Sequence, residues 1–108
     1  MKRGKVVTIA MQGDFGKPRP ALVVQSDVFS DIHPTVTVAL ISSEIKQAPI
    51  FRLDIEPNEA NGLTRPSQVQ IDKIMSIRSE KIGSVIGELN DVMMVRVNRA
   101  LALWLGLA

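Results

Sequence analysis

Short runs of β-branched and other apolar residues, separated by clusters of turn-forming residues, make up the first three quarters of this 108-residue chain. Such runs are typical of strands, and the glycine, proline and asparagine residues between them end one strand and begin the next. The predicted strands are 5–11, 21–25, 35–41, 50–56 and 67–72, with 74–77 either continuing the last one or forming a neighbouring strand. Runs this short predict a strongly bent antiparallel sheet or barrel of roughly five or six strands.

Two of the predicted strands alternate between apolar and polar residues, as a strand does when one face lies in the core and the other in water. In 50–56 the apolar face holds Phe51, Leu53 and Ile55, and the polar face holds Arg52, Asp54 and Glu56. In 67–72 the inward residues are Val69 and Ile71, and the outward residues are Gln68, Gln70 and Asp72. Both are therefore predicted to be half-buried.

The C-terminal segment follows the period of a helix. Asn90 is a suitable N-cap, and Asp91 places a negative charge where the helix dipole favours one. The apolar face consists of Met93, Val97, Ala100, Leu101 and Trp104, and Trp104 is expected in the core together with Phe51. The chain is therefore predicted to form one domain, residues 1–108, with an SH3-like small barrel of antiparallel strands and a C-terminal α-helix.

The other side of this helix is polar except for Val92, Val95 and Leu103. Isolated apolar residues on a surface are ordinary. Three of them on one short helix have a second interpretation, which is a contact with another subunit.

The residue types present narrow the possible chemistry. The chain has no cysteine and one histidine, which excludes disulfides, thiolate nucleophiles and cysteine-based zinc or iron–sulfur sites. No metal and no cofactor is predicted, and a reaction must rely on Arg, Lys, Ser, Thr, Asp or Glu. The longest uncharged run, 32–43, is far shorter than the roughly 20 residues that span a bilayer, so a cytoplasmic protein with no membrane segment is expected.

Positive charge is concentrated near the N-terminus. Residues 1–26 carry five basic side chains and one acidic one, whereas 27–62 carry two basic and six acidic side chains. A basic surface suits a phosphate-bearing partner, and the alternative is an ordinary solvated surface.

The segment 13–20 holds the densest group of candidate functional residues, among them Lys17 and Arg19. Pro18 and Pro20 flank Arg19 and restrict the backbone on both sides of it. A guanidinium held on so stiff a base suits phosphate recognition, and the alternative is a surface ion pair.

Polar residues at strand ends and on strand faces give further candidates. Ser42 and Ser43 follow the predicted strand 35–41, where their hydroxyls either bind a phosphate oxygen or close a turn toward Glu44. Gln70 and Asp72 project from one strand face, a placement that suits the lining of a groove and equally suits solvent.

Several segments in sequence order resemble the MazF/PemK family of toxin endoribonucleases, also called mRNA interferases. They are RGKVV at 3–7, RPALVVQ at 19–25, PTVTV at 34–38 with the two serines at 42–43, GL at 62–63, the strand 67–77 with DKI at 72–74, and the helix 89–101. No single segment is decisive, but together they cover nearly the whole chain.

The resemblance implies an SH3-like barrel, a homodimer, and sequence-selective, metal-independent cleavage of single-stranded RNA to 2′,3′-cyclic phosphate and 5′-hydroxyl ends. It also implies neutralisation by a cognate antitoxin. Arg19 matches the family's catalytic arginine, Ser42 matches a position usually held by a catalytic threonine, and Asp72 matches a base used by some members. Lys17, Ser43 and Gln70 are then expected to contact RNA.

Two other functions fit a chain of this kind. One is a CcdB-like toxin that acts on DNA gyrase through protein contacts, for which Arg19 and Ser42 would have no role. The other is a non-catalytic RNA-binding barrel. An arrangement that brings Arg19 and Ser42 into one groove would argue against this last alternative.

Overall fold

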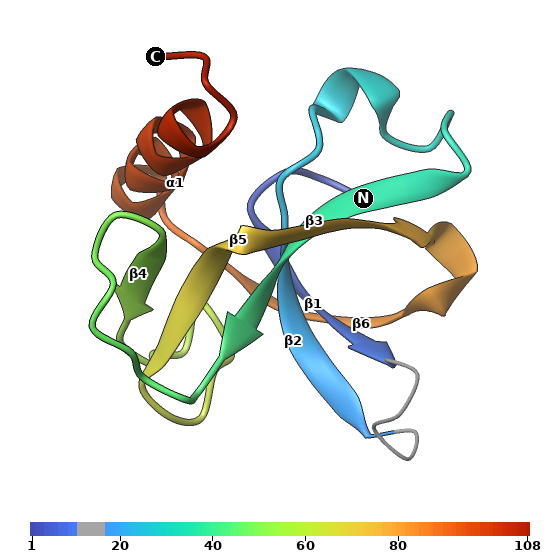
Figure 1. Cartoon of the computed structure of the whole chain (residues 1–108). Coiled ribbons are helices and arrows are strands. Elements are labelled where there is room, and N and C mark those ends of the chain that lie inside the picture. The colour runs from blue at the N-terminus through green and yellow to red at the C-terminus, as the bar shows by residue number, and fades with distance from the viewer. Residues whose placement is uncertain (11–16) are drawn as a thin grey trace.

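The computed structural model describes residues 1–10 and 17–108, which form six strands, two short 3-10 helices and one α-helix (Figure 1). The strands are β1 (Lys5–Ala10), β2 (Pro18–Val23), β3 (Thr35–Ser42), β4 (Arg52–Ile55), β5 (Ser67–Arg78) and β6 (Ile82–Glu88). The helices are η1 (Asp27–Phe29), η2 (Ser79–Lys81) and α1 (Asp91–Trp104). The prediction of a mainly β fold with a C-terminal helix is confirmed.

All six strands belong to one antiparallel sheet in the order β4-β5-β3-β2-β1-β6. The sheet bends strongly, and bulges interrupt both the β3–β5 ladder and the β1–β6 ladder. Bulges increase local twist, which lets the long strand β5 arch over the sheet (Figure 1). Within the described residues no ladder joins β4 to β6, so the small barrel is curled but not closed.

Several strand ends differ from the predicted ones. β2 runs from Pro18 to Val23 rather than over 21–25, with Arg19 paired to Ile9, and β4 is shorter than the predicted 50–56. Of the two alternatives for 74–77, the structure shows continuation, since β5 runs without a break to Arg78. The strand β6 was missed by the sequence analysis, since its sequence, IGSVIGE, is interrupted by two glycines and does not alternate regularly between apolar and polar residues. The end of the first predicted run, Met11, lies outside the described residues.

The sheet is buried on both faces, and this explains why β1, β2 and β3 read as nearly continuous apolar runs. Val6, Leu22 and Ile41 belong to the core cluster that α1 covers through Val97 and Ala100. Val7 and Val38 belong to a second cluster on the other side of the bent sheet. Successive residues of one strand therefore enter opposite cores.

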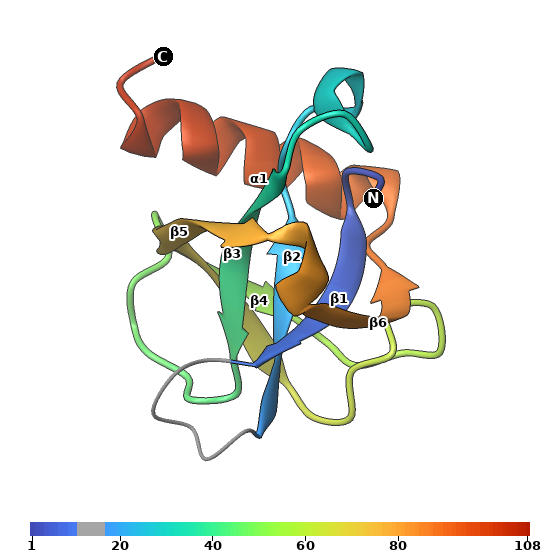
Figure 2. The same cartoon turned by 90° about the vertical axis from the view of Figure 1, so that its right-hand side faces the viewer.

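The helix α1 begins as predicted and packs across one face of the sheet (Figure 2). The side-chain oxygen of Asn90 accepts a hydrogen bond from the Met93 backbone N–H at 2.9 Å, which is the expected N-cap. The expectation that Trp104 lies in the core is wrong: it sits in the last turn and remains 51% exposed. Its ring packs against that of Phe51 in a tilted arrangement, with the ring centroids 5.8 Å apart and the ring planes at 50°. In the described part of the chain, no helix has the length and apolar character needed to cross a membrane.

The predicted outward positions of Arg52 and Gln68 are also wrong. Arg52 is only 6% exposed and Gln68 only 3%. The loop after β3 folds over this face of β4 and β5, where Arg52 donates a hydrogen bond to the Glu44 carbonyl oxygen and Gln68 bonds to the Lys46 backbone. Alternation correctly separated the two faces of the strands, but the polar face is covered by the loop rather than by water.

Candidate functional site

A pocket of about 270 Å³ lies between the start of β2, the end of β3 and the segment before β5. Four of the six predicted site residues line it, namely Lys17, Arg19, Ser42 and Ser43. The β2–β3 ladder brings them together: it pairs Ala21 with Leu40, and continuing that register by two residues sets Arg19 opposite Ser42. The strands β2 and β3, which are separated in the sequence, thus contribute to one site.

A second pocket, of about 300 Å³, adjoins the first. Both pockets are lined by Arg19, Pro20, Ile41 and Ser42. The second one adds Gln70 from β5 and Glu44 from the loop after β3. We refer to the two pockets together as the basic groove.

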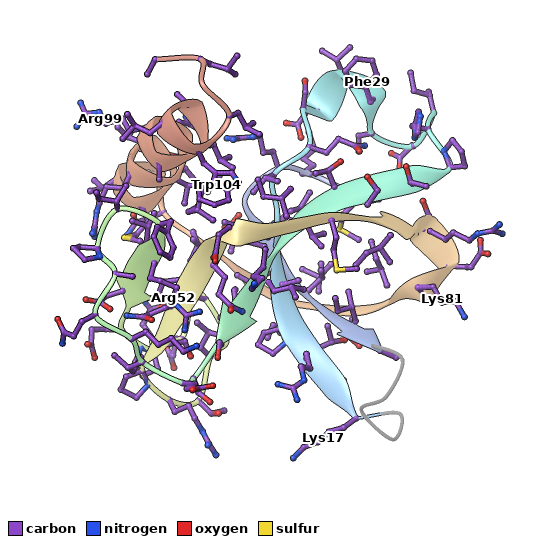
Figure 3. The ribbon with its side chains drawn as sticks, in the orientation of Figure 1. Lys17, Phe29, Arg52, Lys81, Arg99 and Trp104 are labelled. Carbon is purple, nitrogen blue, oxygen red and sulfur yellow. The ribbon has the colours of Figure 1, made fainter. Side chains whose placement is uncertain are left out.

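The charge of the groove favours an anionic ligand. The first pocket is lined by three exposed cationic side chains, Lys17, Arg19 and Arg65, and by no carboxylate among the described residues. Lys17 lies at the tip of β2, at the opposite end of the molecule from Arg99 on α1 (Figure 3). Guanidinium and ammonium groups that converge in this way bind phosphate oxygens well.

The Ser42 hydroxyl is oriented by the backbone. Its oxygen accepts a hydrogen bond from the Glu44 N–H at 3.0 Å, the turn-closing contact that the sequence left open as an alternative. A hydroxyl that accepts one hydrogen bond still has its own proton to donate. Ser42 therefore closes the turn and also offers a donor to the groove.

Gln70 and Asp72 lie two residues apart on β5 but in different surroundings. Gln70 lines the second pocket and accepts a hydrogen bond from Arg52 at 2.7 Å. Asp72 lines neither pocket of the groove. Its side chain is 19% exposed, with Oδ2 3.9 Å from Lys73 Nζ, and its Oδ1 is buried with no hydrogen-bond partner among the described residues.

Two residues that line the groove were missed by the sequence analysis, Thr64 and Arg65. A signal for one of them was present: Arg65 precedes Pro66 just as Arg19 precedes Pro20. The rest of the predicted loop cluster, residues 13–16, lies outside the described residues.

Another pocket, of about 320 Å³, lies between β4 and the start of α1 and does not suit the same ligands. Its charged lining residues are Asp54, Glu56, Glu88 and Arg96. The acidic excess would repel a phosphate. The basic groove is therefore the better candidate for a nucleic-acid site.

Comparison with known proteins finds sequence similarity over nearly the whole length of the chain. Residues 2–105 match the family described as PemK-like, MazF-like toxin of type II toxin-antitoxin system. A probable endoribonuclease MazF from Mycolicibacterium smegmatis is 39% identical over 109 residues, which cover 100% of this chain and 99% of the relative. Endoribonuclease EndoA from Bacillus subtilis is 30% identical over 112 residues, covering 99% of this chain and 96% of the relative.

Comparison with solved structures leads to related proteins. A mycobacterial endoribonuclease solved in complex with its cognate antitoxin superposes with a TM-score of 0.83 at 24% identity, covering 100% of this chain and 97% of that one. At this identity the likeness concerns the fold alone. Because the sequence match extends from residue 2 to residue 105, the chain belongs to the PemK-like, MazF-like family of toxins of type II toxin–antitoxin systems.

Proposed function

We propose that this protein is a sequence-selective endoribonuclease toxin that cleaves single-stranded RNA, chiefly mRNA, in the basic groove without a metal ion. The observation that carries the proposal is the convergence of Arg19 and Ser42 on one cationic groove. The relatives named endoribonuclease, at 39% and 30% identity over nearly the whole chain, support it. A barrel that only binds RNA would need no catalytic pair, so the convergence of Arg19 and Ser42 also argues against that alternative.

In the proposed reaction, RNA supplies its own nucleophile. The 2′-oxygen loses its proton and attacks the adjacent phosphorus, the bond from phosphorus to the 5′-oxygen breaks, and that oxygen takes up a proton. The products are a 2′,3′-cyclic phosphate and a 5′-hydroxyl, and no water or cofactor enters this step. The protein must align the attacking and leaving oxygens and stabilise the charge on the pentacoordinate phosphorus.

Arg19 is proposed to stabilise that charge, with Ser42 donating a hydrogen bond to the phosphate. A guanidinium stays protonated in proteins, so Arg19 acts through charge and donors rather than by transferring protons. Lys17 and Ser43, which line the same pocket, are proposed to hold the neighbouring phosphates.

Asp72 stays our candidate for the general base, although it lies outside the groove residues. It lies two residues after Gln70 on β5, at the position that the family resemblance assigns to a base. An Asp72→Asn variant that keeps full activity would remove it from the mechanism.

Two partners are proposed on the same grounds. The solved mycobacterial relative was captured with its cognate antitoxin, and an acidic antitoxin segment would complement Lys17, Arg19 and Arg65 in the groove.

A second copy of the chain would cover Val92, Val95 and Leu103, which are 72%, 47% and 59% exposed on α1. A strict monomer in sedimentation at micromolar concentration would exclude the homodimer.

The proposed function is tested by incubating the purified protein with a long single-stranded RNA in excess chelator. We expect cleavage at a limited set of sequences, at the same rate with and without chelator, because no step of the reaction needs a metal. Mapping the ends should give 2′,3′-cyclic phosphates and 5′-hydroxyls. Cleavage that stops in chelator, or that leaves 5′-phosphates, would contradict the mechanism.

Ser42 allows a graded test of its hydroxyl. Ser42→Thr keeps the donor and restricts χ1, so we expect activity within about threefold of the wild type. Ser42→Ala removes both the donor and the acceptor for the Glu44 N–H, and we expect kcat/KM to fall by about tenfold to a hundredfold. Single-turnover cleavage of one short RNA compares the three proteins, and equal rates for the alanine variant and the wild type would show that the hydroxyl has no catalytic role.

A further inference from the structure

Arg52 is a buried cation directly behind the basic groove. It lies on the edge strand β4, and Figure 3 shows it between β4 and β5. It is only 6% exposed, and in the described residues its guanidinium bonds to three neutral oxygens. Nε donates to Gln68 Oε1 at 2.9 Å, Nη1 to Gln70 Oε1 at 2.7 Å and Nη2 to the Glu44 carbonyl oxygen at 2.6 Å.

These contacts determine how the Gln70 amide is turned. A guanidinium has only donors, so the Gln70 atom next to Arg52 Nη1 must be the carbonyl oxygen. The amide nitrogen Nε2 is then the polar atom left for the groove, which Gln70 lines. In the part of the chain that the structure describes, Nε2 donates to no protein acceptor.

The same guanidinium holds the loop that follows the catalytic serine. Its bond to the Glu44 carbonyl fixes the residue whose N–H orients the Ser42 hydroxyl. Gln68 fastens the next part of the loop by accepting from the Lys46 N–H and donating to the Lys46 carbonyl, both at 3.0 Å. Burying a charge is costly unless it is well bonded, and two of the three bonded acceptors, on Gln70 and Glu44, belong to residues that line the groove.

We infer that Arg52 is a positioning residue that makes Gln70 an obligatory donor in the groove, so that Gln70 Nε2 binds a hydrogen-bond acceptor of the RNA. The inference rests on the proposed function. The acceptor is an oxygen or ring nitrogen of a base, or an oxygen of the sugar–phosphate backbone. A glutamine that was free to flip would present either its amide nitrogen or its carbonyl oxygen to the RNA. The contact would then discriminate less well between RNA acceptors and RNA donors.

Coupling between the two side chains is the first test. Gln70→Leu removes the donor, and Arg52→Lys cannot bond Gln68, Gln70 and Glu44 at once because an ammonium lacks the planar fork. We expect kcat/KM for a short RNA to fall about tenfold in each single variant and well short of the hundredfold product in the double variant, where only the contact of Arg52 with the loop after β3 is lost in addition. Arg78→Lys, on the exposed far end of β5, is the matched control and should cleave at the wild-type rate.

A multiplicative loss of about a hundredfold in the double variant would overturn the inference, as would wild-type activity in Arg52→Lys. An active wild type with an unaffected Gln70→Leu would overturn this inference and leave the proposed function intact. A wild type that cleaves no RNA would overturn both.

Gln70→Glu keeps the test valid if Arg52→Lys does not fold. A glutamate accepts from Arg52 as the glutamine does, so we expect a melting temperature no lower than that of the wild type. It cannot donate, and we expect kcat/KM to fall at least about tenfold, whereas full activity would overturn the inference. Cleavage mapping with Gln70→Leu on a long RNA identifies the acceptor: a base gives relaxed preference at one nucleotide position, and the backbone gives a uniform loss at every site.

Discussion

Arg19→Ala is expected to reduce RNA cleavage by about a thousandfold or more while leaving the fold intact. Loss of a single donor that stabilises transition-state charge costs about a hundredfold to a thousandfold, and Arg19 contributes both a fork of donors and a full positive charge. The fold should survive because the side chain is exposed and the pairing of Arg19 with Ile9 uses only the backbone. Single-turnover cleavage and urea unfolding of the same preparations separate the two effects.

Two further arginine variants make this result specific. Arg19→Lys keeps the charge but not the planar fork, and an intermediate loss is expected. Arg78→Ala removes an exposed arginine that lies at the far end of β5 and lines neither pocket of the groove, and should cleave like the wild type. An Arg19→Ala protein that retains full activity would remove Arg19 from the reaction and, with it, the main support for catalysis in this groove.

Gly62→Ala is expected to lower the free energy of unfolding by about 3 kcal/mol and the melting temperature by about 15 °C. Gly62 has φ +70°, where side chains are strained, and a Cβ there would meet the Ile86 carbonyl oxygen of β6. The turn before it is held by Asn61, which is 2% exposed and whose Oδ1 accepts from the Asn58 and Leu63 N–H groups. Displacing this turn also moves the segment that carries Arg65 into the groove.

Gly106→Ala is the matched control. Gly106 has φ +74° after the end of α1, but among the described residues no heavy atom outside its two chain neighbours lies within 4 Å of the position that its Cβ would occupy. It should therefore show only the backbone strain, about 1 kcal/mol. Equal losses for the two variants, measured by urea unfolding, would mean that the close approach of Gly62 to β6 adds nothing.

Local patterns predicted much of the fold because they depend on neighbouring residues. The Asn90 cap and the apolar stripe of α1 are properties of one helix. The strand β6 has no comparable pattern. It is held by its ladder with β1, which lies more than seventy residues away in the chain, and such pairing leaves no local signal.

The candidate site was predictable to a similar degree. Arg19 between its two prolines and Ser42 at the end of a strand are visible as stiff or polar positions. Arg52 looked like a solvent-facing residue because alternation distinguishes the two faces of a strand but not what covers them. The loop after β3 covers that face, and its contacts with Arg52 and Gln68 exist only in the folded chain.

The sequence by itself determined which segments other than β6 become strands and helix, where the helix is capped, and which side chains have the chemistry for an RNA phosphate. Those properties follow from backbone preferences and from side-chain type, which act over a few residues. Only the tertiary structure decided that Arg19 and Ser42 line one pocket, that Arg65 joins them, and that Arg52 is buried and bonded to Gln70. These arrangements depend on strand register and loop packing, which bring together residues that have no local relation in the chain.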